Sequence, residues 1–290
     1  MKKVGLLAAC AALFSLSASG QISVEVTVDQ DQFLRGEAIK VAVFITNLSG
    51  RDLHLGADPD WLTFTVASRD GGVVAQSGEV PVKGEFVLES ARRATKRVNL
   101  EPFFSCSRSG GYSVVATVRI KEWDQERKSA PKPFFVIEGA KLWEQDFGVP
   151  KAAGATNEAP EVRKYTLQQA NYIKGQLRLY LRVSDASGAQ VLATVPIGTM
   201  LSFSHPEPQV DRLSNLHLIY QNYAKTFTYS VFNPEGELLN RETYDYVDSR
   251  PRLRVEEGGK ISIAGGVKRV SLNDPLVPQK PLNDLPAAKP

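Results

Sequence analysis

Cysteine is nearly absent from this sequence, because its 290 residues include only Cys10 and Cys106. Cys10 lies in an N-terminal apolar run that we expect to be removed, which leaves Cys106 without an intramolecular disulfide partner. A nucleophilic Cys106 would need a histidine partner and a lowered pKa. Its position within Phe103-Phe104-Ser105-Cys106-Ser107 favours a small, half-buried thiol instead. The fold must therefore be held together by ordinary packing.

Histidine is equally scarce, since only His54, His205 and His217 occur. None stands in a known catalytic pattern. The sequence also lacks a Gly-x-Ser-x-Gly elbow, a His-Glu-x-x-His zinc motif, a phosphate loop and a cysteine pair for a metal. His217 interrupts an alternating apolar run and is interpreted as a structural histidine. The sequence therefore predicts no enzyme activity, no cofactor and no metal site. A hydrolase with an unfamiliar active site is the third alternative.

An excess of one charge is also missing. The chain has 35 basic and 32 acidic residues, and two of the basic ones, Lys2 and Lys3, belong to the segment that we expect to be removed. The net charge of the mature chain is therefore near zero, so no excess of positive charge attracts nucleic acid or an anionic membrane. The apolar run Val4–Leu16 is shorter than the roughly 20 residues that span a bilayer. We therefore expect no nucleic-acid partner and no transmembrane segment.

The N-terminus has the pattern of a secretory signal peptide. Lys2 and Lys3 precede the apolar run Val4–Leu16, and the small residues Ser17-Ala18-Ser19-Gly20 follow it. Cleavage is predicted near Gly20 and would remove a leader of residues 1–20. We therefore expect a secreted or periplasmic protein. The residues Leu7-Ala8-Ala9-Cys10 match the lipobox motif of lipoproteins, so a lipid anchor at Cys10 is the alternative.

What the mature chain does contain is apolar alternation of period two in short segments, interrupted by turn residues. This pattern is typical of antiparallel strands and predicts an all-β fold. Seven strands are predicted in the first half, at residues 23–28, 39–45, 61–66, 86–88, 96–100, 112–120 and 134–137. Their spacing is that of a β-sandwich.

Several segments of this half resemble a bacterial immunoglobulin-like sandwich over residues 22–138. They are the run Phe33-Leu34-Arg35-Gly36-Glu37, the strand end Thr46-Asn47 and the segment Gly110-Gly111-Tyr112-Ser113-Val114. Within that group, Asn47–Leu55, Leu62–Val66 and Asp70-Gly71 are similar to BsuPI-type proteinase inhibitors and macroglobulin-like domains. The resemblance implies a sandwich and permits inhibition through a sandwich loop, although it identifies no reactive loop.

The remaining chain divides into three predicted parts. Residues 139–160 are predicted to be a linker, residues 161–270 an antiparallel β-meander domain, and residues 271–290 a disordered proline-rich tail. A weak repeat, in which Gly188 and Gly236 hold equivalent places, resembles the blades of a β-propeller. There is room for only two blades and a fraction, so we expect stacked or adjacent meanders unless several chains assemble into a ring.

Two groups of side chains are candidates for binding a partner. Three arginines are spaced by two, so a strand would place them on one face, and several tyrosines crowd the same stretch. They are Arg250, Arg252, Arg254, Tyr223, Tyr229, Tyr244 and Tyr246. The simpler interpretation is a solvated face and the rim of a β core. The sequence thus predicts an exported, non-catalytic binding or structural protein of the cell envelope that recognises a protein or a glycan. The alternative is an inhibitor of an extracellular protease.

Overall fold

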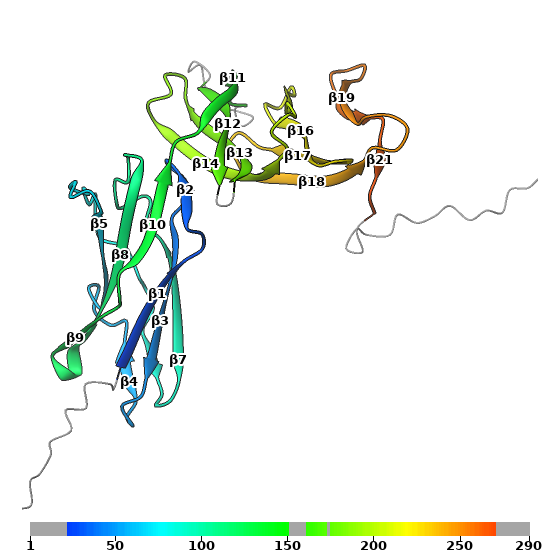
Figure 1. Cartoon of the computed structure of the whole chain (residues 1–290). Coiled ribbons are helices and arrows are strands. Elements are labelled where there is room, and N and C mark those ends of the chain that lie inside the picture. Colours follow the sequence, from blue (N-terminus) through cyan, green and yellow to red (C-terminus); the bar gives the residue numbers. More distant parts are fainter. Residues whose placement is uncertain (1–21, 151–160, 173–174, 271–290) are drawn as a thin grey trace, which may run out of the picture. The chain divides into compact units, whose positions relative to one another are not determined.

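The protein is seen here as a computed structural model that describes residues 22–150, 161–172 and 175–270 (Figure 1). It consists of two compact units, which divide between Glu138 and Gly139. The predicted signal peptide, residues 151–160 of the predicted linker and the predicted tail lie outside the described residues. Nearly all regular structure in the described part is β, with one short 3₁₀ turn at Lys121–Trp123, so the all-β prediction is confirmed. None of the described helical segments could cross a membrane.

Unit 1 contains two main sheets and a small two-stranded sheet. The first sheet has the order β1 (Ile22–Val28), β3 (Lys40–Asn47) and β7 (Arg93–Asn99). The second has the order β2 (Gln32–Leu34), β10 (Lys132–Ile137), β8 (Gly110–Ile120) and β5 (Leu62–Ser68), with β9 (Gln125–Lys128) paired to β8. Strands β4 (Leu53–Leu55) and β6 (Phe86–Leu88) form the small two-stranded sheet. All pairs are antiparallel except β2 with β10.

The core of unit 1 lies between these two sheets because their strands alternate buried and exposed side chains. Val43 and Ile45 from β3 and Val114 from β8 are fully buried in one shared cluster. Two polar side chains fix its edges. The Trp61 indole N–H donates to the carbonyl of Val82 over 2.9 Å, and the Tyr112 hydroxyl donates to the Arg108 carbonyl over 2.7 Å.

Unit 2 is built from two consecutive antiparallel meanders. The first meander comprises β11 (Ala140–Gly148), β12 (Val162–Tyr172), β13 (Gln176–Asp185) and β14 (Val191–Met200). The second comprises β15 (Glu207–Val210), β16 (Leu216–Tyr223), β17 (Thr226–Phe232) and β18 (Leu238–Asp245), with β21 (Val267–Lys268) at its edge. A separate hairpin, β19 (Arg252–Val255) with β20 (Ile261–Ala264), lies near β15 and β16.

The second meander buries side chains on both of its faces. Its inner face, with Leu218 and Phe232, packs against the first meander, whose Tyr165 and Leu181 are fully buried. Its outer face carries a smaller cluster of four buried side chains, covered in part by Leu253 and Ile263 of the hairpin. Strands β16 and β17 are therefore the most central elements of unit 2.

The linker prediction for residues 139–160 is wrong over its first part, because β11 occupies Ala140–Gly148. This strand pairs with β12 along its length, and the Phe147 ring stacks on Tyr165 with centroids 4.0 Å apart. Most of its other side chains are exposed or half-buried, so its sequence shows little apolar alternation. The low apolar content that suggested a linker lies in residues 150–160, of which 151–160 are outside the described residues.

Candidate functional site

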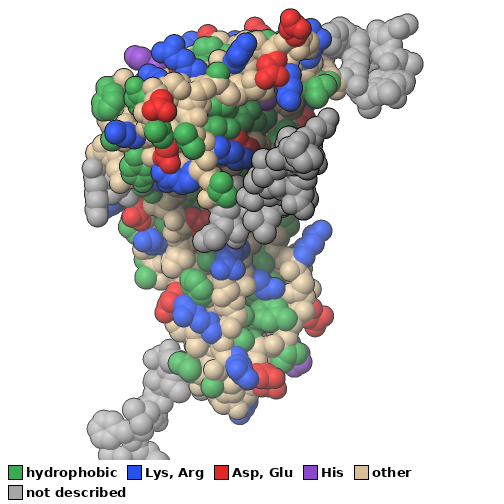
Figure 2. Space-filling view, turned by 90° about the vertical axis from the view of Figure 1, so that its right-hand side faces the viewer, with side chains coloured by type: hydrophobic (Ala, Val, Ile, Leu, Met, Phe, Trp, Pro, Cys, Tyr) green, Lys and Arg blue, Asp and Glu red, His purple; other side chains and the backbone are tan. Residues whose placement is uncertain are grey.

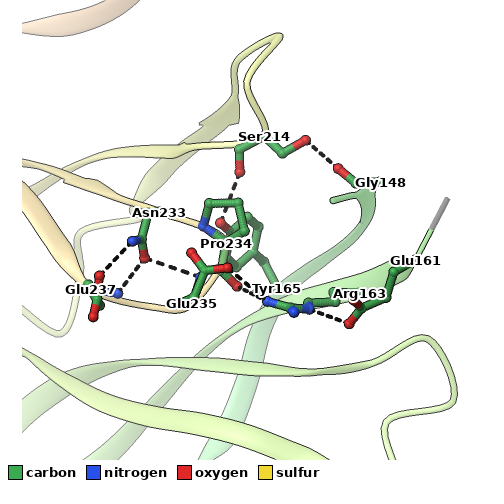
Figure 3. Close-up of polar contacts among 9 residues, drawn as sticks. All are labelled: Gly148, Glu161, Arg163, Tyr165, Ser214, Asn233, Pro234, Glu235 and Glu237. Carbon is green, nitrogen blue, oxygen red and sulfur yellow. Dashed lines mark hydrogen bonds and ion pairs between the residues drawn. The ribbon is translucent and has the colours of Figure 1, made fainter. Parts of the chain in front are cut away.

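A set of polar contacts joins the two meanders of unit 2 and fixes the second one in place (Figure 3). The buried Tyr165 hydroxyl donates to the Ser214 carbonyl over 2.9 Å, and the Ser214 hydroxyl donates to the Gly148 carbonyl over 2.6 Å. Ser214 adopts a left-handed backbone conformation, with φ of 64°. A serine holds this sparsely populated conformation when its surroundings fix it. Both polar groups of Ser214 are thus committed to joining the sheets.

Arg163 provides a second connection between the meanders. Its guanidinium donates to Glu161 over 2.6 Å, to the Pro234 carbonyl over 3.1 Å and to Glu235 over 3.3 Å (Figure 3). The hydrogen bond with Glu161 is the main reason that the pKa of Arg163 is raised. The groups drawn in Figure 3 are bonded within the chain, so this cluster holds the two sheets of unit 2 together.

The outer face of the second meander holds a chain of three polar side chains. His217, on β16, lies between Asp211 and Tyr229: its Nδ1 is 2.7 Å from the Tyr229 hydroxyl and its Nε2 is 3.1 Å from Asp211 Oδ2. Asp211 also accepts the backbone N–H groups of Leu213 and Asn215, each over 2.8 Å. All three side chains are half-buried or buried, so the hydrogen bonds compensate for lost contact with water.

The pKa values indicate the direction of these hydrogen bonds. Burial opposes ionisation of Asp211, but hydrogen bonds from Asn215 and His217 outweigh it and lower the pKa of Asp211. Burial, with Glu242 and Asp211 nearby, raises the pKa of Tyr229 to about 12. An ionised carboxylate can only accept, so His217 Nε2 donates to Asp211, and its Nδ1 pairs with the Tyr229 hydroxyl. This arrangement contains no activated nucleophile, because Tyr229 stays a neutral phenol.

A second polar group lies beside it on β18. The Tyr244 hydroxyl and the Lys268 ammonium donate to Glu242 over 2.8 and 2.9 Å, respectively. Burial and this hydrogen bond raise the pKa of Tyr244. Tyr229 lies directly opposite Glu242 in the register, so the two polar groups are neighbours on one face. Among the described residues no group of three or more metal-ligating side chains was found.

The three arginines predicted to share one strand face do not do so. Strand β19 begins at Arg252, and only Arg252 and Arg254 lie exposed on it. Arg250 precedes the strand, with its guanidinium 5.2 Å from the centroid of the Phe227 ring and 3.8 Å from Glu207. The separation occurs because the chain at Ser249 and Arg250 is irregular, so strand alternation does not apply there.

The four candidate tyrosines are also separated. Tyr229 and Tyr244 lie in the outer-face cluster, where Tyr229 has only 7% of its surface exposed. Tyr223 and Tyr246, exposed to 65% and 43%, lie at the strand ends around the turn between β16 and β17. Two of the four are thus part of the packing, as the simpler interpretation of the tyrosines expects, and two are exposed.

The arginines without a partner gather around one hairpin. Six of the nine arginines of unit 2 contact an acid, a carbonyl or an aromatic ring: Arg163, Arg178, Arg182, Arg241, Arg250 and Arg269. Among the described residues, Arg212, Arg252 and Arg254 show no such partner. Arg212 belongs to the turn before β16, but its side chain reaches the hairpin turn. A Cβ atom added at Gly259 in that turn would lie only 2.7 Å from Arg212 Nε. We call these three arginines the hairpin arginines.

Figure 2 shows Lys and Arg side chains interspersed with Asp and Glu over the face that it draws. The positive charge at the hairpin comes from arginines for which the described structure shows no ion pair.

Unit 1 offers a cleft of about 450 Å³ beyond the end of β5. Ser68, Asp70 and Tyr112 line it together with Arg108 and the segment from Gly72 to Ala75. Cys106 lies beside this region, where burial, and then the charge of Glu101, raises the pKa of its thiol to about 11. A thiol with so high a pKa is a weak nucleophile at neutral pH.

Comparisons with known proteins add no family. No known family model matches the chain, and no curated protein does. Among solved structures, that of Spo0M, a sporulation control protein from Bacillus subtilis, aligns with 86% of this chain and 91% of its own at 10% identity and a TM-score of 0.31. At this score the likeness carries nothing about fold or function.

Sequence reasoning missed Arg212 and the contacts of His217. Arg212 lies about 40 residues before the hairpin in the sequence, so only the folded chain brings them together. For His217, the alternation of β16 placed the imidazole on the opposite face from Leu216 and Leu218. That signal identified its face, whereas its partners come from a turn and from the neighbouring strand.

Proposed function

We propose that this chain is an exported, non-catalytic recognition protein that binds its partner through the hairpin arginines. The observation that supports this most is the contrast within unit 2: six arginines contact an acid, a carbonyl or an aromatic ring, and the three without such a contact surround one hairpin. Exposed guanidinium groups without an acidic neighbour are available to an anionic partner.

In the same proposal, unit 1 is an immunoglobulin-like sandwich and the meanders of unit 2 are blade-like. The tie between the Tyr112 hydroxyl and the Arg108 carbonyl supports the first part, because a tyrosine bonded to the backbone a few residues upstream is a feature of such sandwiches. Two successive four-stranded meanders support the second. Sandwich and blade are scaffolds that present loops and hairpins, which agrees with a recognition role.

The experiment is co-sedimentation of the mature chain with cell-envelope fractions. The variant Arg212→Gln/Arg252→Gln/Arg254→Gln should lose at least about tenfold in bound fraction, since each neutralised contact weakens an ionic interface. A control carries the same charge change at exposed arginines of unit 1: Arg35→Gln/Arg51→Gln/Arg97→Gln. Equal binding by the two variants would show that the hairpin arginines are not the recognition surface.

Inhibition of an extracellular protease is a second candidate, supported by the segment that follows β5. Val73 there is 97% exposed. The turn before it is braced by Asp70, which accepts the Ser68 hydroxyl and the Gly72 N–H, and Ala75 accepts the Ser105 N–H over 2.9 Å. A braced loop that exposes an aliphatic side chain is suited to entering a protease pocket. Titration of elastase-like proteases tests it: Val73→Asp should abolish any stoichiometric inhibition seen with the wild type.

A further inference from the structure

The hairpin presents two different sides. Leu253 and Ile263 point to the outer face of the second meander and pack there. Arg252 and Arg254 alternate with Leu253 and therefore point away from it, to solvent. Their cross-strand partners are Ala264 and Ser262, which are small and uncharged. No acid thus lies directly opposite either guanidinium.

Arg212 extends this pair toward the hairpin turn. Its side chain lies against Gly259, whereas Arg254 is the last arginine of β19 before the same turn. Lys260, exposed at the start of the returning chain, adds a fourth cation. The turn also contains Glu256 and Glu257, so the hairpin and Arg212 together carry four cations and two acids, a local excess of positive charge.

The cations form a row rather than a pocket. Residues two apart on a strand are separated by about 7 Å, and Arg212 lies at the turn beyond Arg254, so the three side chains start from points spread along the hairpin. A linear ligand whose negative charges repeat along its length can contact all three. The geometry therefore favours an extended polyanion over a free small anion.

The side chains around the row favour a polysaccharide among polyanions. Single-stranded nucleic acid is held by rings that stack on its bases, and the tyrosines on this face of unit 2, Tyr229 and Tyr244, lie in the packed cluster. Stable protein interfaces have an apolar or aromatic centre, whereas the small residues Ser262 and Ala264 lie opposite the arginines. Carboxylates or sulfates on a sugar chain need only guanidinium groups and hydroxyls.

We infer that the hairpin arginines bind a linear polysaccharide bearing carboxylate or sulfate groups. This inference rests on the proposed recognition function and names its ligand class. Bidentate hydrogen bonds from guanidinium groups hold the anionic groups, and the Ser262 hydroxyl is available to a sugar hydroxyl between them.

The test measures binding of the mature chain to polygalacturonate and to dextran sulfate, with neutral dextran, polyglutamate and a single-stranded oligonucleotide as comparison probes. The wild type should bind one or both acidic polysaccharides and should not bind neutral dextran. Its binding should become weaker as salt is added. Arg252→Gln/Arg254→Gln should lose at least about tenfold, whereas Arg51→Gln/Arg97→Gln should bind like the wild type. Preference between the two acidic probes distinguishes carboxylate from sulfate.

Two glycines supply a test without a change of charge. Gly258 and Gly259 both have positive φ, so alanine strains the turn at either position, but only a Cβ at Gly259 meets Arg212. Gly259→Ala should therefore displace Arg212 and weaken polysaccharide binding several-fold more than Gly258→Ala does. Equal effects of the two alanine substitutions would show that Arg212 does not belong to the binding site.

The outcomes separate this inference from the proposed function. Stronger binding to polyglutamate or to the oligonucleotide than to either polysaccharide would overturn the ligand class. If the wild type binds no acidic polysaccharide, yet its envelope co-sedimentation is lost in the triple arginine variant, the ligand class is wrong and the recognition surface stands. If co-sedimentation is also unaffected, both proposals fail.

Discussion

At the scale of single residues, the environment of Cys106 shows how packing changes reactivity. Burial and the nearby Glu101 charge raise the pKa of its thiol to about 11, so at pH 8 the folded chain should contain roughly a hundredfold less thiolate than an unfolded one. We expect a thiol reagent to label native Cys106 slowly and the urea-unfolded chain at the rate of a free thiol. Equal rates would show that the thiol is exposed.

The raised pKa of Cys106 also makes the free energy of unfolding depend on pH, because folding favours the protonated thiol. In the unfolded chain the thiol releases its proton near its ordinary pKa of 9.0, but in the folded chain only near 11. Folding therefore favours the protonated thiol, and this contribution is complete below pH 9 and declines as pH rises toward 11. Cys106→Ser should reduce the loss of stability between pH 9 and 11, measured by urea unfolding.

Tyr229 is the residue that completes the His217 chain. Tyr229→Phe keeps the ring but leaves the buried Nδ1 of His217 without its 2.7 Å partner, which should cost about 1 to 2 kcal/mol of unfolding free energy. Tyr246→Phe is the control, because the Tyr246 side chain is 43% exposed and its change should stay within about 0.5 kcal/mol. Urea denaturation measures both, and matching values would mean that the hydrogen bond does not contribute to stability.

At the scale of elements, strand β7 forms an edge of the first sheet of unit 1 and carries a lysine on its core side. Lys96 pairs in register with the buried Val43, and its ammonium lies 4.3 Å from the centroid of the Phe86 ring. A charge on the inner side of an edge strand discourages pairing with a second molecule. Lys96→Leu should therefore cause concentration-dependent association in sedimentation experiments, while Lys96→Arg stays monodisperse.

How far elements could be predicted from sequence depended on their length and burial. Alternation located β1, β3 and β8 to within a few residues, because each has one buried face over seven or more residues. Strands β2 and β4 have three residues each and were not predicted, whereas β6, which is equally short, was predicted at residues 86–88. At the candidate site, the spacing of two found Arg252 and Arg254, but it placed Arg250 on their face because sequence alone does not fix where a strand begins.

At the scale of the whole molecule, the two units have separate cores. The buried cluster of unit 1 draws on residues between Ile22 and Val136, and the buried residues of the two clusters of unit 2 on those between Phe147 and Phe232. A core that takes no residues from the other unit should support folding by itself. We expect separately produced chains of residues 22–138 and 139–270 to unfold cooperatively, each with its own tryptophan signal, from Trp61 and Trp123 in the first and Trp143 in the second.

Matched core substitutions in the full chain test the same separation. Leu62→Ala in unit 1 and Leu181→Ala in unit 2 remove the same atoms from sites with almost no exposure, so each should cost about 2 to 5 kcal/mol. If the cores are independent, calorimetry should show two transitions, and each variant should lower only that of its own unit, because distant sites without shared partners act additively. A shift of both transitions by either substitution would mean that the units fold as one, and the 22–138 and 139–270 chains would then fail to fold alone.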